Sequence, residues 1–196
     1  MLENVSAYLA KKTVLPTKDN IDVLTYGYEL ALSTLFTSIL LLVIASLAGE
    51  IMAGVIFIIS YVPIRVCAGG YHAKTFVGCN CFSAASFVIL LLAYRFGEVY
   101  FSNFMWLCIL FVSALIILYY APCEHKNQPL TDEKRLKNRR QVKIRLPIEM
   151  IVILLLFWRD FSQVYVAILS LSLVAILLII PSIMKGENNE NIIKID

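Results

Sequence analysis

Apolar residues gather in six stretches along the chain, separated by short polar breaks. The stretches run approximately over Leu30–Leu47, Ile51–Ile64, Phe82–Tyr94, Phe104–Tyr120, Ile148–Trp158 and Phe161–Pro181. Breaks at Gly49-Glu50, Arg95–Glu98 and Arg159-Asp160 indicate where the chain turns back. A perpendicular span needs about 20 residues, so the shorter stretches must be completed by less apolar neighbours. None alternates as a membrane strand does, and unpaired backbone is costly in lipid. The pattern predicts an all-α polytopic membrane protein with about six transmembrane helices.

Residues 1–29 are predicted to form a separate interfacial segment. Apolar residues recur there at helical spacing on both sides of Pro16. These residues are Leu2, Val5, Leu9, Ile21, Leu24 and Tyr28. Two short amphipathic helices, hinged at the proline and lying among the lipid headgroups, fit this pattern. A polar N-terminus without fixed structure is the alternative. Charged residues interrupt the segment, so it lacks the apolar region of a cleaved signal peptide.

The composition excludes several classes of protein. Hydrophobic residues make up 60% of the chain and charged residues 16%, with a mean hydropathy of +0.79. A soluble domain has about 45–50% apolar and about 25% charged residues. A soluble domain, a nucleic-acid-binding module and a disordered tail are therefore excluded. Five Cys residues are too sparse, and odd in number, for a disulfide scaffold. We expect one integral membrane domain over 1–196, with membrane lipid and no nucleic acid among its partners.

The distribution of basic residues predicts the orientation. With six spans, both termini lie on one side of the membrane. Every Lys and Arg except Arg95 and Arg159 then falls on that same side. Loops rich in Lys and Arg stay in the cytoplasm. We therefore expect a multi-pass protein of the cell membrane with both termini in the cytoplasm, including a tail over 182–196.

A basic cytoplasmic loop over 121–147 is the longest polar stretch. Its basic residues are Lys126, Lys134, Arg135, Lys137, Arg139, Arg140, Lys143 and Arg145. They could hold the loop to anionic lipid, at about 1 kcal/mol per basic residue near the surface. They could instead form a docking strip for an acidic peptide. We find no internal repeat of the kind that builds many transporters.

The segment 65–81 carries most of the residues capable of chemistry. It holds His72, three of the five Cys residues, and the Gly69-Gly70 pair. Ionisable residues close to a membrane are costly, and they are interpreted as functional by default. A Cys with a His nearby is the minimum for nucleophilic catalysis by a thiolate. The segment is therefore a candidate catalytic site.

Catalysis by His72 and Cys79 makes a geometric demand on this segment. The two residues are seven apart, which in a straight helix is a rise of about 10.5 Å. Proton transfer needs hydrogen-bond distance, so the segment must bend or unwind between them, as Gly78 would allow. Gly69 and Gly70 would let the chain turn and bring backbone N–H groups to a developing oxyanion.

The same residues have simpler interpretations. A Cys in a membrane helix is usually a small packed hydrophobe, as we expect of Cys67 and Cys108. The histidine could serve as a hydrogen-bonded structural residue. Metal binding would draw on Cys67, His72, Cys79, Cys81 and the pair Cys123/His125. Their spacing matches no standard zinc pattern, so we expect neither a metal nor another cofactor.

The residues Arg65, Ala68-Gly69-Gly70, His72 and Cys79 resemble the R-x6-H-x6-C signature of the accessory gene regulator B (AgrB) family. These are membrane cysteine endopeptidases that process the precursors of cyclic autoinducer peptides in Gram-positive bacteria. A second landmark, from Tyr120-Ala121-Pro122 to Lys126–Leu130 and the basic run after it, is similar to an element of the same family. The resemblance covers most of the chain.

The resemblance implies a mechanism. Cys79, assisted by His72, would attack the precursor at the boundary between its core and its acidic C-terminal tail. The core, left as a thioester, would then be closed into a thiolactone or lactone by its own thiol or hydroxyl. Arg65 would be essential, and we expect it to orient a carbonyl or carboxylate. The active site would face the cytoplasm, and a homodimer is expected. An acidic tail favours the docking strip, with Lys126, Asn127, Lys134, Arg135, Arg139 and Arg140 as substrate-binding residues.

Several alternatives stay open. Cys81 could replace Cys79 as the nucleophile, and His125 is a rival base. No carboxylate stands close to His72 in sequence, so a third catalytic residue could be Asn80 or Asn127. A small peptide exporter would need polar residues within the spans, where serine and threonine are the most polar present. A non-catalytic scaffold would tolerate replacement of Cys79.

Overall fold

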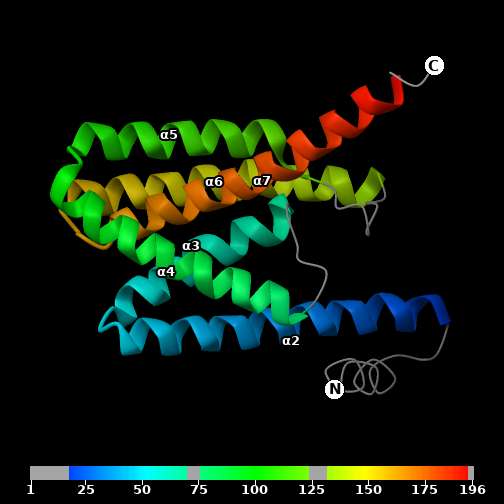
Figure 1. Ribbon diagram of the computed structural model, residues 1–196, viewed down its shortest axis with the longest axis horizontal. Helices are drawn as coiled ribbons and strands as arrows, with labels where there is room; N and C mark the ends of the chain where they lie inside the picture. The colour runs from blue at the N-terminus through cyan, green and yellow to red at the C-terminus, as the bar shows by residue number, and fades with distance from the viewer. Residues whose placement is uncertain (1–17, 70–75, 124–131, 194–196) are drawn as a thin grey trace.

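The computed structural model describes residues 18–69, 76–123 and 132–193, and over these ranges the chain is helical (Figure 1). The helices are α2 (Lys18–Leu47), α3 (Ile51–Ala68), α4 (Phe76–Tyr100), α5 (Asn103–Tyr120), α6 (Asp132–Trp158) and α7 (Val164–Ile193). The first five expected apolar stretches each lie within one of these helices, and the sixth, Phe161–Pro181, begins three residues before α7. The all-α class is therefore confirmed for the described part of the chain.

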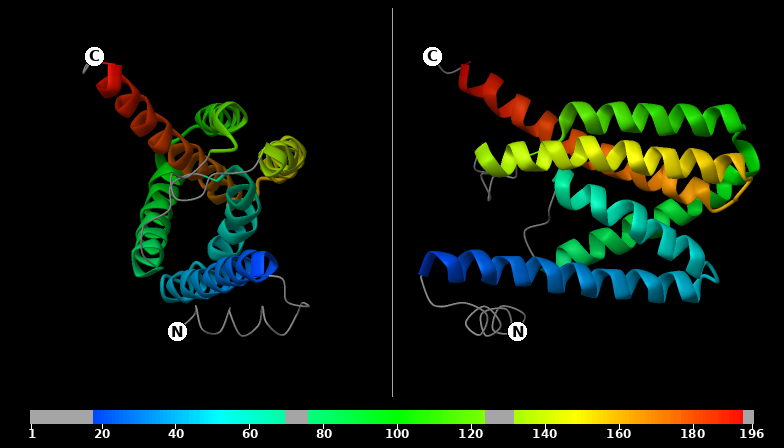
Figure 2. Two further views of the ribbon diagram at one scale, coloured as in Figure 1. Left: turned by 90° about the vertical axis from the view of Figure 1, so that its right-hand side faces the viewer. Right: turned by 180° about the vertical axis from the view of Figure 1, so that it is seen from behind.

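The six helices run back and forth along one bundle axis (Figures 1 and 2). Helix α7 lies at the centre and packs against α3, α4, α5 and α6, whereas α2 packs against α3 and α4 on one side. The beginning of α2 and the end of α7 lie at the same end of the bundle (Figure 1). This arrangement agrees with an even number of crossings.

Two of the three expected turns are present, and the third was wrong. Gly49, with φ 73°, separates α2 from α3, and Asp160, with φ 51°, lies between α6 and α7. The predicted break at Arg95–Glu98 is instead part of α4, which continues to Tyr100. The next helix begins after Ser102, whose side chain accepts a hydrogen bond from the Met105 N–H at 3.4 Å.

The charges at the predicted break are satisfied without a turn. The Arg95 guanidinium forms a salt bridge with Glu50 at the start of α3. The Tyr94 hydroxyl donates to the Glu98 carboxylate at 3.4 Å. A Cβ on Gly97 would lie 2.6 Å from Cζ2 of Trp106. Gly97 therefore serves the close packing of α4 against Trp106.

The interfacial segment is described only in part. Residues 1–17, with the first expected amphipathic helix and the Pro16 hinge, lie outside the described residues. Residues 18–29 are helical, as expected, but they do not form a separate helix. Helix α2 runs without a break from Lys18 to Leu47, so this part joins directly to the first apolar stretch.

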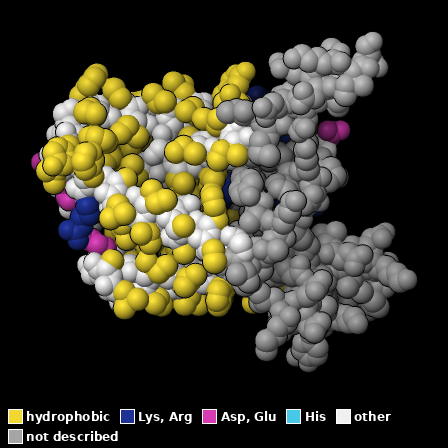
Figure 3. All heavy atoms as spheres, viewed as in Figure 1, with side chains coloured by type: hydrophobic (Ala, Val, Ile, Leu, Met, Phe, Trp, Pro, Cys, Tyr) yellow, Lys and Arg dark blue, Asp and Glu magenta, His cyan; other side chains and the backbone are white. Residues whose placement is uncertain are grey.

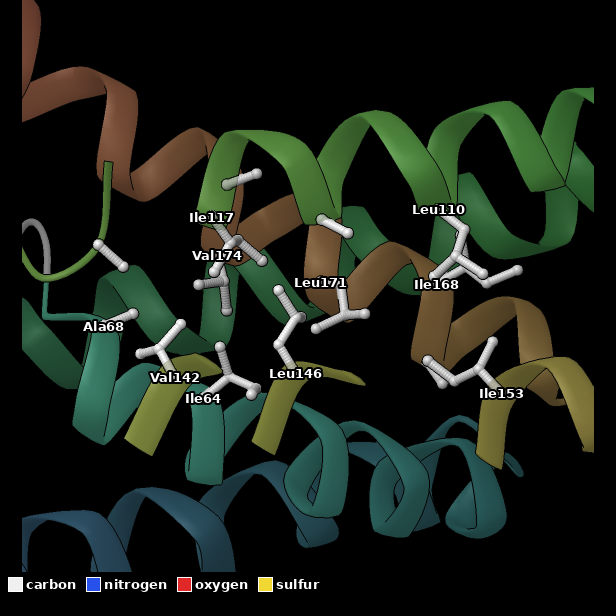
Figure 4. Close-up of a cluster of buried hydrophobic side chains, with 14 of the residues drawn as sticks. Ile64, Ala68, Leu110, Ile117, Val142, Leu146, Ile153, Ile168, Leu171 and Val174 are labelled. Atoms are coloured by element: carbon white, nitrogen blue, oxygen red, sulfur yellow. The ribbon is translucent and has the colours of Figure 1, made fainter. Parts of the chain in front are cut away.

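The bundle has two groups of buried side chains. The larger lies between α3, α5, α6 and α7 and includes Ile64, Trp106, Leu146 and Leu171 (Figure 4). The smaller lies between α2, α3 and α4, with Val166 of α7. Helices α3 and α7 contribute to both groups and so hold the two halves of the bundle together.

Many large apolar side chains lie on the outside of the bundle. Leu47, Tyr119 and Trp158 are 85%, 80% and 81% exposed, and similar residues occur along every described helix. Figure 3 shows hydrophobic side chains across the middle of one face, with charged ones toward its two ends. An apolar surface of this extent marks a site of membrane or protein contact.

Three helices of the described chain are long and apolar enough to cross a membrane. The spans are Ile51–Ala68, Asn80–Tyr100 and Asn103–Tyr120. Two further apolar segments, Ala31–Leu47 and Val164–Ile180, are shorter. Helix α6 is 27 residues long, but its N-terminal half is basic. The count of six spans and the cytoplasmic placement of both termini therefore stay predictions.

Candidate active site

The elements that flank the two sequence landmarks meet at one end of the bundle. Helix α3 ends there at Ala68, α4 begins at Phe76, α5 ends at Tyr120, and α6 begins at Asp132 (Figures 1 and 2). The beginning of α2 lies at this end as well. The fold therefore places the candidate catalytic segment and the basic residues of α6 on the same side.

The two landmarks join through their backbones. Gly69 and Cys123 form a parallel β-bridge, and the Cys123 N–H donates to the Ala68 carbonyl at 2.9 Å. Gly69 has φ 73° and ψ −143°, a conformation adopted almost only by glycine. A Cβ on Gly69 would also lie 2.4 Å from the Cys123 carbonyl oxygen. Both its conformation and its contact therefore require glycine at this junction.

Arg65 lies in the last turn of α3 and acts within the same junction. Its Nη1 donates a hydrogen bond to the Gly69 carbonyl oxygen. The Gly69 N–H in turn donates to the Arg65 carbonyl at 3.0 Å. The guanidinium therefore holds the turn that follows α3, a contact that the sequence did not predict.

Several predicted site residues lie outside the described residues. These are His72, Gly70, Lys126 and Asn127, together with the rival base His125. The backbone of Cys79 is described, in the first turn of α4, but its side chain is not. The distance between His72 and Cys79, and the bend expected between them, therefore stay predictions. A helix N-terminus is a favourable place for a thiolate, because its free N–H groups and dipole favour negative charge.

Asn80, a candidate third catalytic residue, contacts another helix. Its side chain is buried, at 6% exposure, and its Oδ1 accepts a hydrogen bond from the Thr37 hydroxyl at 2.5 Å. This bond joins the first turn of α4 to the middle of α2. Cys81, the rival nucleophile, is exposed. The contact between Thr37 and Asn80 has no signal in the sequence, because Thr37 lies in an apolar stretch.

The basic residues after the second landmark lie on a helix rather than in a loop. Helix α6 begins at Asp132, so residues 132–147 of the predicted loop are helical. The predicted substrate-binding residues Lys134, Arg135, Arg139 and Arg140 are all exposed on this helix. Asp132 and Glu133 occupy its first turn, where negative charge is favourable. We call these four basic residues the basic face. The helix holds them at fixed spacing.

A row of polar contacts, which we call the polar seam, joins α6 to α3. Its members are Gln141, Arg145 and Glu149 on α6 and Ser60, Pro63 and Cys67 on α3. The Cys67 thiol donates to Oε1 of Gln141 at 3.0 Å. Arg145 Nη1 donates to both the Pro63 carbonyl and the Cys67 sulfur, each at 3.1 Å. The Glu149 carboxyl lies near Ser60, and its Oε1 is buried and makes no hydrogen bond within the described part of the chain.

The seam corrects two interpretations made from the sequence. The sequence places Arg145 in the basic run, whereas its side chain reaches toward α3. Cys67 is buried, as expected of a packed hydrophobe, but it is also hydrogen-bonded. Cys108, expected to be packed as well, is exposed on α5. Spacing of four residues from Gln141 to Arg145 and Glu149 places them on one helix face, which was the available signal for the seam.

Within the described residues, no three His, Cys, Asp or Glu side chains gather in a way that could hold a metal ion. His72 and His125 lie outside the described residues, and so does the Cys79 side chain.

The exposed apolar helices are typical of a helical membrane protein, and the candidate site lies at one end of the bundle, where the end of α3 meets the segment after α5. The model of the accessory gene regulator B family matches residues 2–183. The chain belongs to this family, which takes part in accessory gene regulation and quorum sensing. The resemblance found in the sequence is thus confirmed.

Curated relatives agree with this assignment. An AgrB-like protein of Halalkalibacterium halodurans is 27% identical over 80% of this chain and 78% of its own length. An AgrB-like protein of Clostridium beijerinckii is 27% identical, over 79% and 74%. The accessory gene regulator protein B of Staphylococcus haemolyticus is 26% identical over 90% of this chain and 92% of its own length. No solved structure matches the chain.

Proposed function

We propose that this protein is a multi-pass membrane cysteine endopeptidase that cleaves the C-terminal tail from a quorum-sensing propeptide and promotes cyclisation of the core. The observation that carries the proposal is the junction of Gly69 with Cys123, which unites the two landmarks beside Arg65. Membership of the AgrB family supports the same function. The site would face the cytoplasm, with a homodimer as the working assembly.

The proposed reaction has two acyl transfers. The Cys79 thiolate attacks the carbonyl at the core–tail boundary, and His72 first takes the thiol proton. The histidine then gives that proton to the departing nitrogen, so the tail leaves with a free amino group. The core remains as a thioester on Cys79. A thiol or hydroxyl within the core attacks this thioester, closes the ring and returns the Cys79 thiol.

A site at the membrane favours ring closure over hydrolysis. Exchange of one thioester for another keeps the acyl group activated, whereas attack by water loses that activation. Exclusion of water suppresses the side reaction, and holding the internal thiol against the acyl group raises its effective concentration.

Arg65 would support this chemistry through the turn that it holds. Its bond to the Gly69 carbonyl fixes the orientation of that planar peptide unit. The N–H of the same peptide unit belongs to Gly70, which lies outside the described residues. We propose that this N–H helps to stabilise the developing oxyanion, where one well-placed donor is worth about 10²–10³ in rate. A direct contact between Arg65 and the substrate carbonyl is compatible with this role, because a guanidinium has five N–H donors.

The test of the function is a product assay. The chain would be co-expressed with a propeptide encoded beside its gene, and membranes without the chain would be the control. We expect mass spectrometry to detect a free tail and a core lighter by one water than the linear acid, as ring closure requires. An intact propeptide in both samples would contradict the endopeptidase function, and a purely linear core would contradict cyclisation.

The basic face is proposed to bind the acidic tail, as the substrate-binding residues of this site. Replacing Lys134, Arg135, Arg139 and Arg140 together with Gln should raise the apparent KM for the propeptide. Exposed ion pairs contribute about 0.3–0.5 kcal/mol each, so we expect an increase of about 10-fold. The loss should be largest at low salt, because surface charges are screened at high salt.

A neutral-tail propeptide distinguishes tail binding from lipid binding by the basic face. If the face binds the tail, neutralising the tail should raise KM for the wild type and add little to the Gln variant. If the face contacts anionic lipid instead, the Gln variant would change the membrane behaviour of the protein and leave KM unchanged.

A further inference from the structure

We infer that Arg145 is a positioning residue, which holds the last turn of α3 in place for cleavage and takes no part in binding the tail. The inference rests on the proposed function and deepens it. Arg145 differs from the other basic residues of α6 because its side chain reaches toward α3.

Arg145 is exposed, and its side-chain hydrogen bonds are made to α3. A single nitrogen, Nη1, donates to the Pro63 carbonyl and to the Cys67 sulfur, both at 3.1 Å. The Cys67 thiol in turn donates a hydrogen bond to Gln141, which lies one turn before Arg145 on α6. Cys67 is 2% exposed and therefore lies between two polar residues of the facing helix.

Apolar side chains make up much of the remaining contact between these helices. Ile64 and Ala68 of α3 meet Val142 and Leu146 of α6 in the larger buried group (Figure 4). Apolar packing tolerates small slips along the helix axes, whereas hydrogen bonds with defined directions do not. Pro63 lies inside α3, where a proline lacks an N–H donor and weakens the helix. The hydrogen bond that is missing at Pro63 is the one to the Ile59 carbonyl, and the bonds from Arg145 and Gln141 fix the part of α3 that follows this gap.

The turn fixed in this way carries the candidate site. Arg65 lies between Pro63 and Cys67, and Gly69 follows Cys67 by two residues. Arg65 bonds to the Gly69 carbonyl, and Cys123 bonds to Ala68. The hydrogen bonds from Arg145 and Gln141 join this turn of α3 to α6, the helix that carries the basic face. Tail binding on α6 and cleavage beside α3 would therefore share one rigid element.

The kinetic consequence differs from that of the basic face. Misplacement of a reacting group by about 1 Å can reduce the rate by about 10²-fold without weakening substrate binding. We expect Arg145→Met to lower kcat by about 10-fold or more while KM stays within about twofold. Lys143→Met is the matched control, because Lys143 is exposed on the same helix and carries the same charge. It should leave both constants near their wild-type values.

A readout without substrate tests the seam separately. Loss of Arg145 should leave the Cys67 thiol more accessible, so its rate of modification by a maleimide, followed by peptide mass spectrometry, should increase several-fold. Lys143→Met should not change this rate. An unchanged rate in Arg145→Met would overturn the assignment of the contact.

The outcomes separate this inference from the proposed function. Absence of tail release by the wild type contradicts the proposed function. A raised KM with unchanged kcat in Arg145→Met would place the residue in tail binding and overturn the inference. Kinetic constants equal to those of the wild type in Arg145→Met would also overturn it. If Arg145→Met does not accumulate, Arg145→Lys decides, because an ammonium lacks the planar fork of a guanidinium. It should lower kcat with KM unchanged, and an unchanged kcat would overturn the inference.

Discussion

Replacing Cys79 with Ala is expected to abolish release of the propeptide tail, with a loss of more than about 10³-fold in turnover. The reason is that, in the proposed mechanism, the Cys79 thiol forms the thioester from which the core is cyclised. The assay is the mass spectrometry of the co-expressed propeptide, with variant protein in the membrane quantified by immunoblot. Binding of the propeptide should survive, because the basic face is untouched.

Two further variants give this prediction its control. Cys81→Ala should keep wild-type activity, since Cys81 lies two residues beyond the expected nucleophile and is exposed. His72→Ala should lower turnover by about 10²–10⁴-fold, the usual contribution of a general acid–base. If Cys81→Ala is inactive and Cys79→Ala is active, the nucleophile is Cys81. Full activity in all three variants would favour a non-catalytic scaffold or an exporter.

Gly69→Ala is expected to lower tail release by about 10²-fold and to lower the melting temperature in detergent. A side chain here must adopt a glycine conformation, at a cost of about 1–3 kcal/mol. It must also displace the Cys123 carbonyl, which lies 2.4 Å from the Cβ position. The backbone bridge between the landmarks would separate, and Arg65 would lose its acceptor in the correct place.

Gly49→Ala is a matched control for this prediction. Gly49 has the same φ of 73°, but nothing lies within 4 Å of its Cβ position. Both variants therefore incur backbone strain, and only Gly69→Ala disturbs the junction. We expect Gly49→Ala to be somewhat destabilised and still to release the tail at close to the wild-type rate. Equal loss of activity in both variants would show that strain alone is responsible.

The sequence predicted the helices well, because apolar length in a membrane protein is a strong signal. It misplaced the turn after the third apolar stretch, because charged residues near a helix end look like a loop. Arg95 is instead paired with Glu50 of another element, which no local pattern reveals. The sequence likewise predicts a loop for the basic segment after residue 131, where the structure has a helix. Lys and Arg are good helix formers, and α6 extends through them.

The candidate site was predicted as a set of residues but not as an arrangement. Spacing and family resemblance identified Arg65, Gly69, His72 and Cys79. They did not indicate that Gly69 would touch Cys123, since contacts between distant segments depend on how the helices pack. The polar seam was missed for the same reason: Arg145 has the same charge as its neighbours, and only its direction separates it from them.

The central position of α7 has a consequence for the order of biosynthesis. This helix contacts α3, α4, α5 and α6, and Ile168, Leu171 and Val174 are completely buried. It is also the last described helix to leave the ribosome. Until α7 has been made, the apolar faces of the earlier helices that later contact it are therefore exposed to lipid or to an insertion factor. The junction beside Arg65 joins the end of α3 to the segment after α5, and both helices pack against α7. The proposed proteolytic activity would therefore appear only after α7 has been made. A nascent chain that lacks α7 would thus lack the proposed activity.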